Sequence, residues 1–474
     1  MRIVLFHPRG FTQDRSSRRL HQLACTMPPM GLASIAAVCR NAGHTVTIFD
    51  AALSQTISNE QWARRIIAFT PDIVGFSAIT SSFLDAYDCA VRIKNANTSI
   101  KTVFGGPHAS WGKDLLLRKF DAIDYIIAGE GEFSFCKLAD GIAPESIEGL
   151  HYRNNGAIEK GPLQIGCDMD DLPFPAYDLL DGFPRKYLMP LFSYPKHPGA
   201  NVISSRGCVY QCSYCDRSVF GKTFRFNSPK YTSELVKKLA TDFGVRHINF
   251  YDDLFTMNRP RVSELCELLI QHNRRVSFNC IVRLGHIDDD LLKVLKKAGC
   301  FMVNVGIESG DQDILDKHKS GLTLETIRGD IARIAAAGIF VKGLFMMGFP
   351  GETAQSIAKT KAFALSLPIK DANMTAFTPF PGAPISKDIR GFGEFDEDWA
   401  KMDCEHFVFV PNQLGSKKLL ETLNRDFIKS FYQRKQMRLL YMKMLFRAPH
   451  SYYRLMRHAA AFLPYALSLN RTES

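Results

Sequence analysis

Strand-like and helical segments alternate along most of this 474-residue chain, in two separate series. In the first series, short apolar runs rich in β-branched residues occupy residues 3–7, 45–50, 73–78, 102–104 and 125–128. Helical spacing of apolar residues lies between several of these runs, at 31–41 and 86–94. This alternation predicts a doubly wound α/β fold, in which ligands bind beyond the carboxyl ends of parallel strands.

Three loops follow strands of the first series and are its candidate ligand-binding loops, at residues 77–82, 105–110 and 129–132. Glycine in the second and third loops allows the backbone to approach a ligand closely, because no Cβ atom intervenes. A loop of this kind is just as often a tight turn that binds nothing. Both interpretations stay open from these residues alone.

An acidic, proline-rich stretch at residues 166–199 separates the two series and predicts a linker. The second series has expected strands at 201–205, 247–251, 276–282, 301–307, 339–346 and 373–378. Helical patterns lie between them, at 231–243, 259–272, 288–298, 322–337 and 353–366. Strands and helices in this order predict a partial (βα)6 barrel with its chemistry at the strand carboxyl ends. We therefore expect domains at 1–165 and 200–399, followed by a mainly helical extension at 400–474.

Three cysteines, Cys208, Cys212 and Cys215, follow the first strand of the second series with the spacing CxxxCxxC. Three thiolates in one loop can face one centre, which suits a soft metal or an iron-sulfur cluster. A structural zinc site needs a fourth ligand nearby, and the next cysteines, Cys266 and Cys280, fall on other expected elements. The spacing favours a cluster with one open iron, with zinc and chance as the alternatives.

This loop, with Tyr214 before its third cysteine and a barrel strand before it, resembles the radical S-adenosylmethionine (SAM) superfamily. The resemblance implies that Cys208, Cys212 and Cys215 bind a 4Fe-4S cluster and that SAM chelates the fourth iron. The reduced cluster would then cleave SAM to a 5'-deoxyadenosyl radical. The implied SAM contacts are Tyr214 near the adenine, Asp252 and Asp253 at the amino group, Arg283 at the carboxylate, and Glu308 and Ser309 at the ribose.

Two of these implied SAM contacts could instead have a purely structural role. The aspartates that follow the second barrel strand also fit the N-cap of the next helix. The arginine that follows the third strand also fits a surface ion pair.

The first series resembles the cobalamin-binding radical SAM enzymes, near the group of the anaerobic magnesium-protoporphyrin monomethyl ester cyclase and several C-methyltransferases. The segments that carry the resemblance are residues 28–32, 105–108, 129–132 and 172–175, and it covers about residues 1–385. It implies a Rossmann-like cobalamin-binding domain. The implied cobalamin contacts are Met30, Gly31, Ser77, Thr80, Gly105, Gly106, Pro107, His108, Gly129, Glu130, Gly131 and Glu132. The first series contains no Asp-x-His-x-x-Gly motif, so we expect His108 to make loop hydrogen bonds rather than to bind cobalt.

The resemblance implies either of two reactions. In radical C-methylation, one SAM supplies a methyl group through cobalamin and a second SAM supplies the radical that activates a carbon of a small-molecule or lipid-like substrate. In an oxidative or cyclising reaction, cobalamin delivers no methyl group. Both need an electron donor such as flavodoxin or ferredoxin. A sensor that binds nucleic acid is a third class, but the chain has no recognised DNA-reading motif, so we expect no nucleic-acid partner.

The net charge of +11 is concentrated at the C-terminal end, where residues 400–474 carry an excess of +8. Apolar and basic residues interleave there from Leu419 to Leu455. The pattern favours an amphipathic helix packed on the barrel, with an anionic membrane surface as the alternative. We find no apolar stretch of the roughly 18–20 residues that span a bilayer and no signal-peptide pattern at Met1. We therefore expect a cytoplasmic chain with free cysteines, and membrane association only through the extension.

Overall fold

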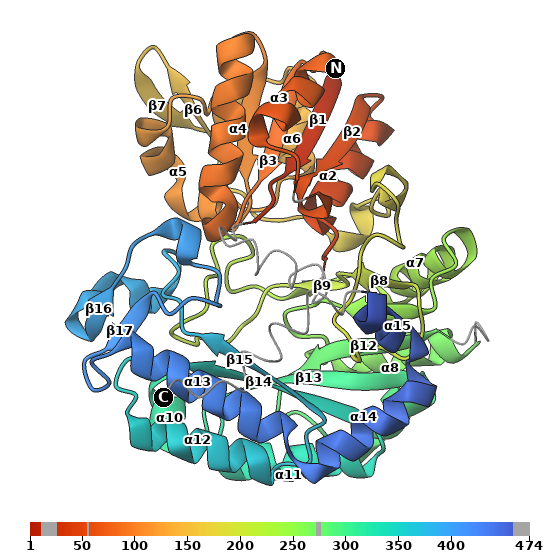
Figure 1. Ribbon diagram of the computed structural model, residues 1–474. Coiled ribbons are helices and arrows are strands. Elements are labelled where there is room, and N and C mark those ends of the chain that lie inside the picture. The colour runs from red at the N-terminus through yellow and green to blue at the C-terminus, as the bar shows by residue number, and fades with distance from the viewer. Residues whose placement is uncertain (11–25, 55, 272–275, 320, 458–474) are drawn as a thin grey trace.

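The computed structural model describes residues 1–10, 26–54, 56–271, 276–319 and 321–457. Figure 1 shows the first domain seated on a second, broader sheet domain, with the C-terminal helices running along the second. The apolar extension of the sequence beyond residue 457 lies outside the described residues.

Within the described residues, the first domain has a seven-stranded sheet with the order β2-β1-β3-β4-β5-β6-β7. Its strands are β1 (Arg2–His7), β2 (Thr45–Asp50), β3 (Ile73–Ser77), β4 (Lys101–Gly105), β5 (Tyr125–Ile127), β6 (Leu150–Asn154) and β7 (Ala157–Lys160). The strands β1 to β5 pair in parallel, and β6 and β7 are added antiparallel at one edge. The strand order changes direction between β1 and β3, which is where a doubly wound sheet opens a crevice for a ligand.

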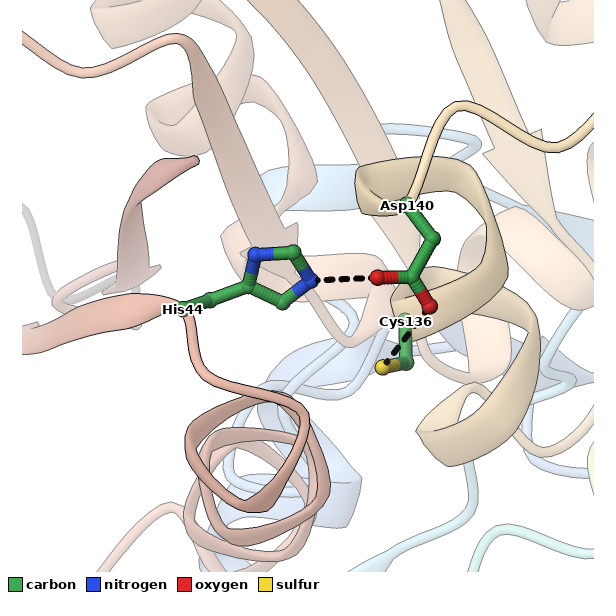
Figure 2. Close-up of side chains that lie close together, drawn as sticks. All are labelled: His44, Cys136 and Asp140. Carbon is green, nitrogen blue, oxygen red and sulfur yellow. Dashed lines mark hydrogen bonds and ion pairs between the residues drawn. The ribbon is translucent and has the colours of Figure 1, made fainter.

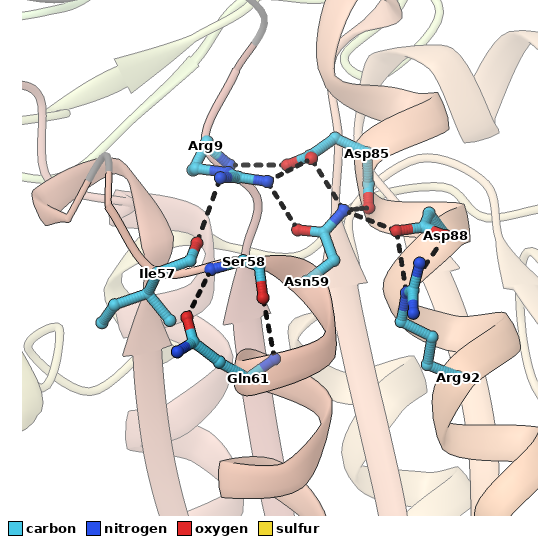
Figure 3. Close-up of polar contacts among 8 residues, drawn as sticks. All are labelled: Arg9, Ile57, Ser58, Asn59, Gln61, Asp85, Asp88 and Arg92. Atoms are coloured by element: carbon cyan, nitrogen blue, oxygen red, sulfur yellow. Dashed lines mark hydrogen bonds and ion pairs between the residues drawn. The ribbon is translucent and has the colours of Figure 1, made fainter.

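Helices cover both faces of this sheet. They are α2 (Met30–Asn41), α3 (Asn59–Ala68), α4 (Phe83–Ala96), α5 (Pro107–Lys119) and α6 (Glu132–Ala139). A polar network fixes the backbone that leaves β1, because Arg9 donates to Asn59 at 2.9 Å and to Asp85 at 3.1 Å (Figure 3). Asn59 in turn donates to Asp85 and Asp88, both at 2.9 Å, so α3 and α4 are held beside the carboxyl end of β1.

In the described part of the second domain, a six-stranded parallel sheet has the order β15-β14-β13-β12-β11-β8. Its strands are β8 (Gly199–Val202), β11 (His247–Phe250), β12 (Ser277–Val282), β13 (Cys300–Glu308), β14 (Phe340–Met347) and β15 (Asp371–Ala376). The connecting helices are α7 (Pro229–Asp242), α8 (Arg259–Gln271), α9 (Asp289–Lys297), α10 (Gln312–His318), α11 (Leu324–Ala336) and α12 (Ala354–Ser366). The predicted α/β fold with a partial (βα)6 barrel is confirmed.

The first barrel strand is shorter than the run expected at 201–205. Strand β8 ends at Val202, and the next residues form β9 (Ser205–Arg206), which pairs antiparallel with β10 (Arg225–Phe226). The break has a local cause: the backbone N–H of Ser204 donates to the buried carboxylate of Asp252 at 2.7 Å instead of continuing the ladder. The break turns the chain toward the cysteine loop.

The C-terminal extension contains β16 (Gly393–Phe395), β17 (Phe409–Pro411), α13 (Lys417–Tyr432), α14 (Lys435–Arg447) and α15 (Pro449–Arg457). Apolar residues of these helices are buried against the barrel, among them Phe427, Phe431 and Met437. The hydroxyl of Tyr432 donates to Asp371 at 2.6 Å, and Arg454 donates to the carbonyl of Met189 at 2.8 Å. The extension is therefore packed on the barrel, as the interleaved pattern favoured. Across the described residues, the helices are too short or too polar to cross a bilayer.

Candidate active site

The cysteine loop begins two residues after β9. Cys212 is buried, and Cys208 and Cys215 are half-buried. Burial, with the neighbouring thiols Cys212 and Cys208, raises the pKa of Cys215 to about 12, and burial also raises the pKa of Cys208. Thiols in such a setting ionise only when a cationic centre stabilises the thiolate, which is the condition that a bound metal cluster supplies.

The three loop thiols do not form a compact ligand group in the described part of the chain. In the described residues, another group of His, Cys, Asp or Glu side chains has ligand atoms that all lie within 4.8 Å of one another. The loop thiols do not belong to such a group. Tetrahedral zinc with bonds of about 2.3 Å would bring its sulfurs to about 3.8 Å from one another. The three loop thiols are not gathered that closely.

That compact group is His44, Cys136 and Asp140, at the amino ends of the first domain's strands (Figure 2). Nε2 of His44 lies 3.0 Å from Oδ1 of Asp140, and Sγ of Cys136 lies 3.7 Å from Oδ2. The amine of Met1 lies 3.0 Å from Nδ1 of His44. Hydrogen bonding within the group accounts for its compactness, and it lies at the opposite edge of the sheet from the ligand crevice.

Tyr214 lies in an aromatic cluster beside the cysteine loop. Its ring meets that of Phe349 edge-on, with the centroids 5.6 Å apart. Burial, together with nearby carboxylate and thiol groups, holds the pKa of Tyr214 well above its usual value. The tyrosine therefore stays neutral and presents an apolar ring wall, which suits a flat heterocycle such as adenine.

His318, which the sequence patterns did not single out, anchors the loop. Its Nδ1 lies 3.0 Å from the hydroxyl of Ser213, its Nε2 lies 3.0 Å from the carbonyl of Pro350, and its ring stacks on Phe349 at 5.0 Å. The backbone N–H of Ser213 also donates to the carbonyl of His318 at 3.0 Å. His318 is a positioning residue that joins the cysteine loop to α10 and to the turn after β14.

The aspartates after β11 have different surroundings. Asp252 is 1% exposed and accepts hydrogen bonds from Ser204 and Ser205, so its carboxylate supports the chain break after β8. Asp253 is exposed and accepts from the backbone N–H of Gly207 at 2.8 Å, directly beside the cysteine loop. In the described part of the chain, the two carboxylates accept hydrogen bonds from residues 204–207, and burial raises the pKa of Asp252, which the positive charge of Arg261 on α8 opposes. Asp253 is the carboxylate that remains accessible.

Glu308 and Ser309 also differ in how accessible their side chains are. Glu308 ends β13 with a φ of +64°, at a shift in the pairing with β14, and its Oε1 accepts from Nζ of Lys319 at 2.8 Å. Ser309 is fully buried, and its hydroxyl lies 3.1 Å from that of Thr360. Only the first of these two side chains is directed to an accessible position.

Arg283 follows β12 at the same edge of the barrel. Its guanidinium lies 3.4 Å from the ring centroid of Tyr210, a residue of the cysteine loop. The hydroxyl of Tyr210 lies 2.6 Å from Nε2 of His286. These contacts place a positive charge next to the loop, where a carboxylate ligand would be stabilised.

A cavity lies beyond the carboxyl ends of β1, β3, β4 and β5, with an empty volume of about 1280 Å³ including its open mouth. Most of the predicted cobalamin contacts line it: Met30, Gly31, Ser77, Gly105, Gly106, Pro107, Gly129, Glu130, Gly131 and Glu132. Gly106 has a φ of +90°, and a Cβ atom there would lie 2.9 Å from the carbonyl oxygen of Ala78. Glycine at this position therefore lets the loop after β4 pack closely against the loop after β3.

The other two predicted contacts, Thr80 and His108, do not line this cavity. His108 is 1% exposed, its Nδ1 lies 3.2 Å from the hydroxyl of Thr80, and its ring packs 4.4 Å from that of Trp399. Burial lowers the pKa of His108 to about 4, so the imidazole is neutral. Among the described residues, the cavity lining contains no histidine, so a cobalamin in this cavity would have no imidazole ligand from them.

The second domain closes the cavity. Arg206, two residues before the first loop cysteine, lines the cavity and donates to Glu130 and, at 2.6 Å, to Glu132. Arg225 on β10 also donates to Glu130. These buried pairs join the loop after β5 to the β9–β10 hairpin. Glu130 and Glu132, which the resemblance implies as cobalamin contacts, therefore both bind arginine. These pairs join residues that lie far apart in the sequence, so sequence patterns could not predict them.

The comparisons agree with this arrangement. The model of the radical SAM superfamily matches residues 202–364, and that of the B12-binding domain matches residues 20–139. An uncharacterised methyltransferase of Pyrococcus horikoshii is 32% identical over 416 residues, which cover 86% of this chain and 88% of the relative. The fold and the site thus define a cobalamin-dependent radical SAM enzyme, and the chain belongs to the B12-binding radical SAM family.

Other relatives carry different activities. The anaerobic magnesium-protoporphyrin IX monomethyl ester cyclase of Rubrivivax gelatinosus is 26% identical, covering 91% of this chain and 77% of the relative. The hopanoid C-3 methylase of Methylococcus capsulatus is 25% identical, covering 87% and 77%. Among solved structures, the methyltransferase TsrM from Kitasatospora setae, with cobalamin and a 4Fe-4S cluster bound, has a TM-score of 0.65 at 17% identity, covering 83% of this chain and 76% of that chain. At that identity the likeness supports the fold.

Proposed function

We propose that this enzyme transfers a methyl group to an unactivated carbon atom of a small-molecule substrate. The observation that carries the proposal is that one short segment serves both cofactor regions. Arg206 lines the cavity of the first domain, and Cys208 begins the cluster loop two residues later. Cobalamin and SAM bound at these places would face a common space, in which a substrate carbon could be reached from both.

The bound cofactors supply the chemistry: a reduced 4Fe-4S cluster cleaves SAM to a radical, and cobalamin carries the methyl group. The residues of the chain bind and orient. Cys208, Cys212 and Cys215 would hold the cluster, Asp253 would accept from the SAM amino group, and Arg283 would pair with its carboxylate. Glu308 would accept from the ribose hydroxyls, and the ring of Tyr214 would lie against the adenine. Asp252 and Ser309 would support these positions from behind.

The cobalamin contacts are proposed for the residues that line the cavity of the first domain. The backbone of residues 105–107 leads into the N-terminus of α5, whose free N–H groups would favour a phosphate of the nucleotide tail. Thr80 and His108 would act behind that loop, because their side chains bond to each other. The proposed domain boundaries separate the cobalamin-binding domain, which ends at 165, the linker, which ends at 199, and the radical SAM core, which ends at 399.

The second candidate is an oxidative or cyclising reaction without methyl transfer, which the 26% identity to the porphyrin cyclase favours. SAM labelled in its methyl group distinguishes the two reactions. In methyl transfer the label enters the substrate, and in the alternative the product carries none. Anaerobic reconstitution with both cofactors, a low-potential donor of the flavodoxin or ferredoxin class and candidate substrates is the experiment.

Cys212→Ala is the matched control for that experiment. Loss of one of three ligands should remove bound iron and sulfide together with the formation of 5'-deoxyadenosine. Cys266→Ala replaces another buried cysteine, on α8, and should keep both. A Cys212→Ala protein that still forms 5'-deoxyadenosine would contradict the proposed cluster site.

We also propose that the enzyme contacts an anionic membrane surface through α14. Several large apolar side chains of this helix are exposed: Leu439 (45%), Met442 (60%), Leu445 (48%) and Phe446 (86%). Basic residues such as Arg438 and Lys443 lie among them in the sequence. Exposed apolar side chains next to positive charge fit the interface of an anionic bilayer.

A further inference from the structure

A second cavity, with an empty volume of about 1060 Å³ including its mouth, lies inside the barrel sheet. Polar side chains from every strand of the described sheet line it. They are Asn201 on β8, Asn249 on β11, Asn279 on β12, Asn304 on β13, Lys342 on β14 and Asn373 on β15. We call these six residues the amide belt. Parallel barrels usually fill this space with bulky aliphatic side chains, so the belt is a departure that needs a cause.

The pairing of the strands brings the belt together. Asn249 is the register partner of both Asn201 and Asn279, and Asn304 is the partner of Lys342. Nδ2 of Asn249 lies 3.4 Å from Oδ1 of Asn201. The carboxamides of β8, β11 and β12 therefore lie at one level of the barrel, whereas Asn304 lies two residues closer to the carboxyl ends of the strands and Asn373 two residues further still. Together they present both donors and acceptors to the cavity.

The belt lies below the proposed SAM contacts on the same strands. Asn279 is four residues before Arg283 along β12, and Asn304 is four residues before Glu308 on β13. At about 3.3 Å per residue, the separation is about 13 Å. A molecule held by the belt could therefore extend to the place where SAM would be cleaved.

The charge inside the belt is balanced. Nζ of Lys342 lies 2.9 Å from Oδ2 of Asp371, and Oδ1 of Asp371 accepts from the hydroxyl of Tyr432 at 2.6 Å. An anionic ligand would have to compete with Asp371 for this lysine, and a cationic ligand would lie against the positive charge of Lys342. Burying an unpaired charge is costly, so the belt disfavours charged ligands.

The belt also disfavours an apolar ligand. Asn201 and Asn279 are 5% and 4% exposed. Nδ2 of Asn279 donates to the carbonyl of Ser193 at 2.7 Å, but its buried Oδ1 has no hydrogen-bond partner in the described part of the chain. A hydrocarbon would strip water from the other carboxamides and leave them unpaired as well, which is unfavourable for each group.

We propose that the substrate presents an uncharged, hydrogen-bonding portion, such as hydroxyl or carboxamide groups, to the amide belt. The proposal rests on the proposed function, because it assigns the barrel cavity to the substrate of that reaction. The cavity also has apolar lining residues, among them Met27, Pro28, Leu188 and Met189, which we call its apolar wall. The belt would therefore hold the polar edge of the substrate, while its apolar edge lies against this wall.

Isosteric probes test the chemistry of the belt. Crystals of the full chain are soaked in equal concentrations of acetamide, acetate or acetamidinium, and others are pressurised with xenon. We expect acetamide ordered against the belt at several times the occupancy of either ion, and no xenon there. Higher occupancy of an ion, xenon at the belt, or no ordered probe in the cavity would overturn the proposal.

Leucine variants provide the controls. Asn304→Leu should remove the ordered acetamide, and so should Asn373→Leu, whose side chain is exposed in the cavity and can be replaced with little risk to folding. Asn95→Leu, on the exposed face of α4, should leave it in place. Acetamide that persists in both belt variants would refute the assignment. Acetamide binding is measured without any turnover. A chain that binds acetamide at the belt but transfers no methyl group would therefore contradict the proposed function and leave the proposal for the belt unaffected.

Discussion

Glu308 adopts a backbone conformation that residues with side chains rarely occupy. A φ of +64° costs on the order of 1 kcal/mol or more, and such residues concentrate at functional sites. Here the conformation follows a shift in strand pairing and directs the carboxylate toward Lys319 at the edge of the barrel. The strain is explained if the carboxylate has to reach a ligand at this position.

Glu308→Gln should therefore weaken SAM binding about tenfold, because a charged acceptor would be lost from the ribose hydroxyls. Equilibrium dialysis of the cluster-loaded protein against SAM measures this change. Glu325→Gln, on the exposed side of α11, is the matched control and should have no effect. Unchanged SAM affinity in Glu308→Gln would place the ribose elsewhere.

Glu352 should make stability depend on pH. Burial raises its pKa to about 8, although the N–H groups of Gly348 and Phe349 donate to its carboxylate. Between its usual pKa near 4.5 and about 8, the unfolded chain loses this proton and the folded chain keeps it, so stability falls as pH rises through that window. Glu352→Gln should remove on the order of 2 kcal/mol of this loss between pH 6 and pH 8. Urea unfolding at both pH values tests it, and an unchanged pH slope in the variant would count against it.

At the scale of elements, the buried pairs around Arg206 connect the loop after β5 to the β9–β10 hairpin. The side chains of Arg206, Glu130 and Glu132 are each at most 10% exposed. Removing one partner of such a network leaves charge buried without compensation. The contact between the domains should therefore depend on this arginine.

Arg206→Leu should lower stability by about 3–5 kcal/mol, because Glu132 would lose its arginine partner and Glu130 would lose one of its two. Denaturant unfolding, with limited proteolysis of the 166–199 linker, measures the loss. Arg40→Leu removes an exposed pair with Asp178 and should cost no more than about 1 kcal/mol. Equal losses in the two variants would refute a special role for the buried network.

The helix α14 presents apolar side chains to solvent although its neighbours pack on the barrel. Replacing Leu445 and Phe446 together by serine should reduce co-sedimentation with phosphatidylserine vesicles at least fivefold, because both side chains are exposed. Substitution of Phe392, an exposed phenylalanine outside the helix, serves as the control. Wild-type protein that fails to bind the vesicles even at low salt would exclude this surface as a membrane contact.

At the scale of the whole molecule, local patterns determined most of the architecture. Alternating apolar runs predict both parallel sheets, and the spacing of Cys208, Cys212 and Cys215 predicts a shared centre because these residues are close in sequence. Helix α10 was not predicted, since seven residues are too few to show helical periodicity. The hairpin β9–β10 was missed because its strands have two residues each.

Features that depend on tertiary pairing could not be predicted. Each asparagine of the amide belt is an ordinary strand residue in the sequence, and only strand register brings Asn249 beside both Asn201 and Asn279. The partner of Glu130 is likewise fixed by domain packing, which places Arg206 against it. The SAM and cobalamin contacts drawn from the resemblance stay predictions until ligands are bound.

The central claim is that one active site uses SAM in two ways, as a methyl donor and as a radical source. The most direct measurement is the ratio of S-adenosylhomocysteine to 5'-deoxyadenosine formed by the anaerobic, cobalamin- and cluster-loaded enzyme with a substrate that it converts. We expect equal amounts of the two, each matching the methylated product. Conversion that yields 5'-deoxyadenosine without S-adenosylhomocysteine would contradict it.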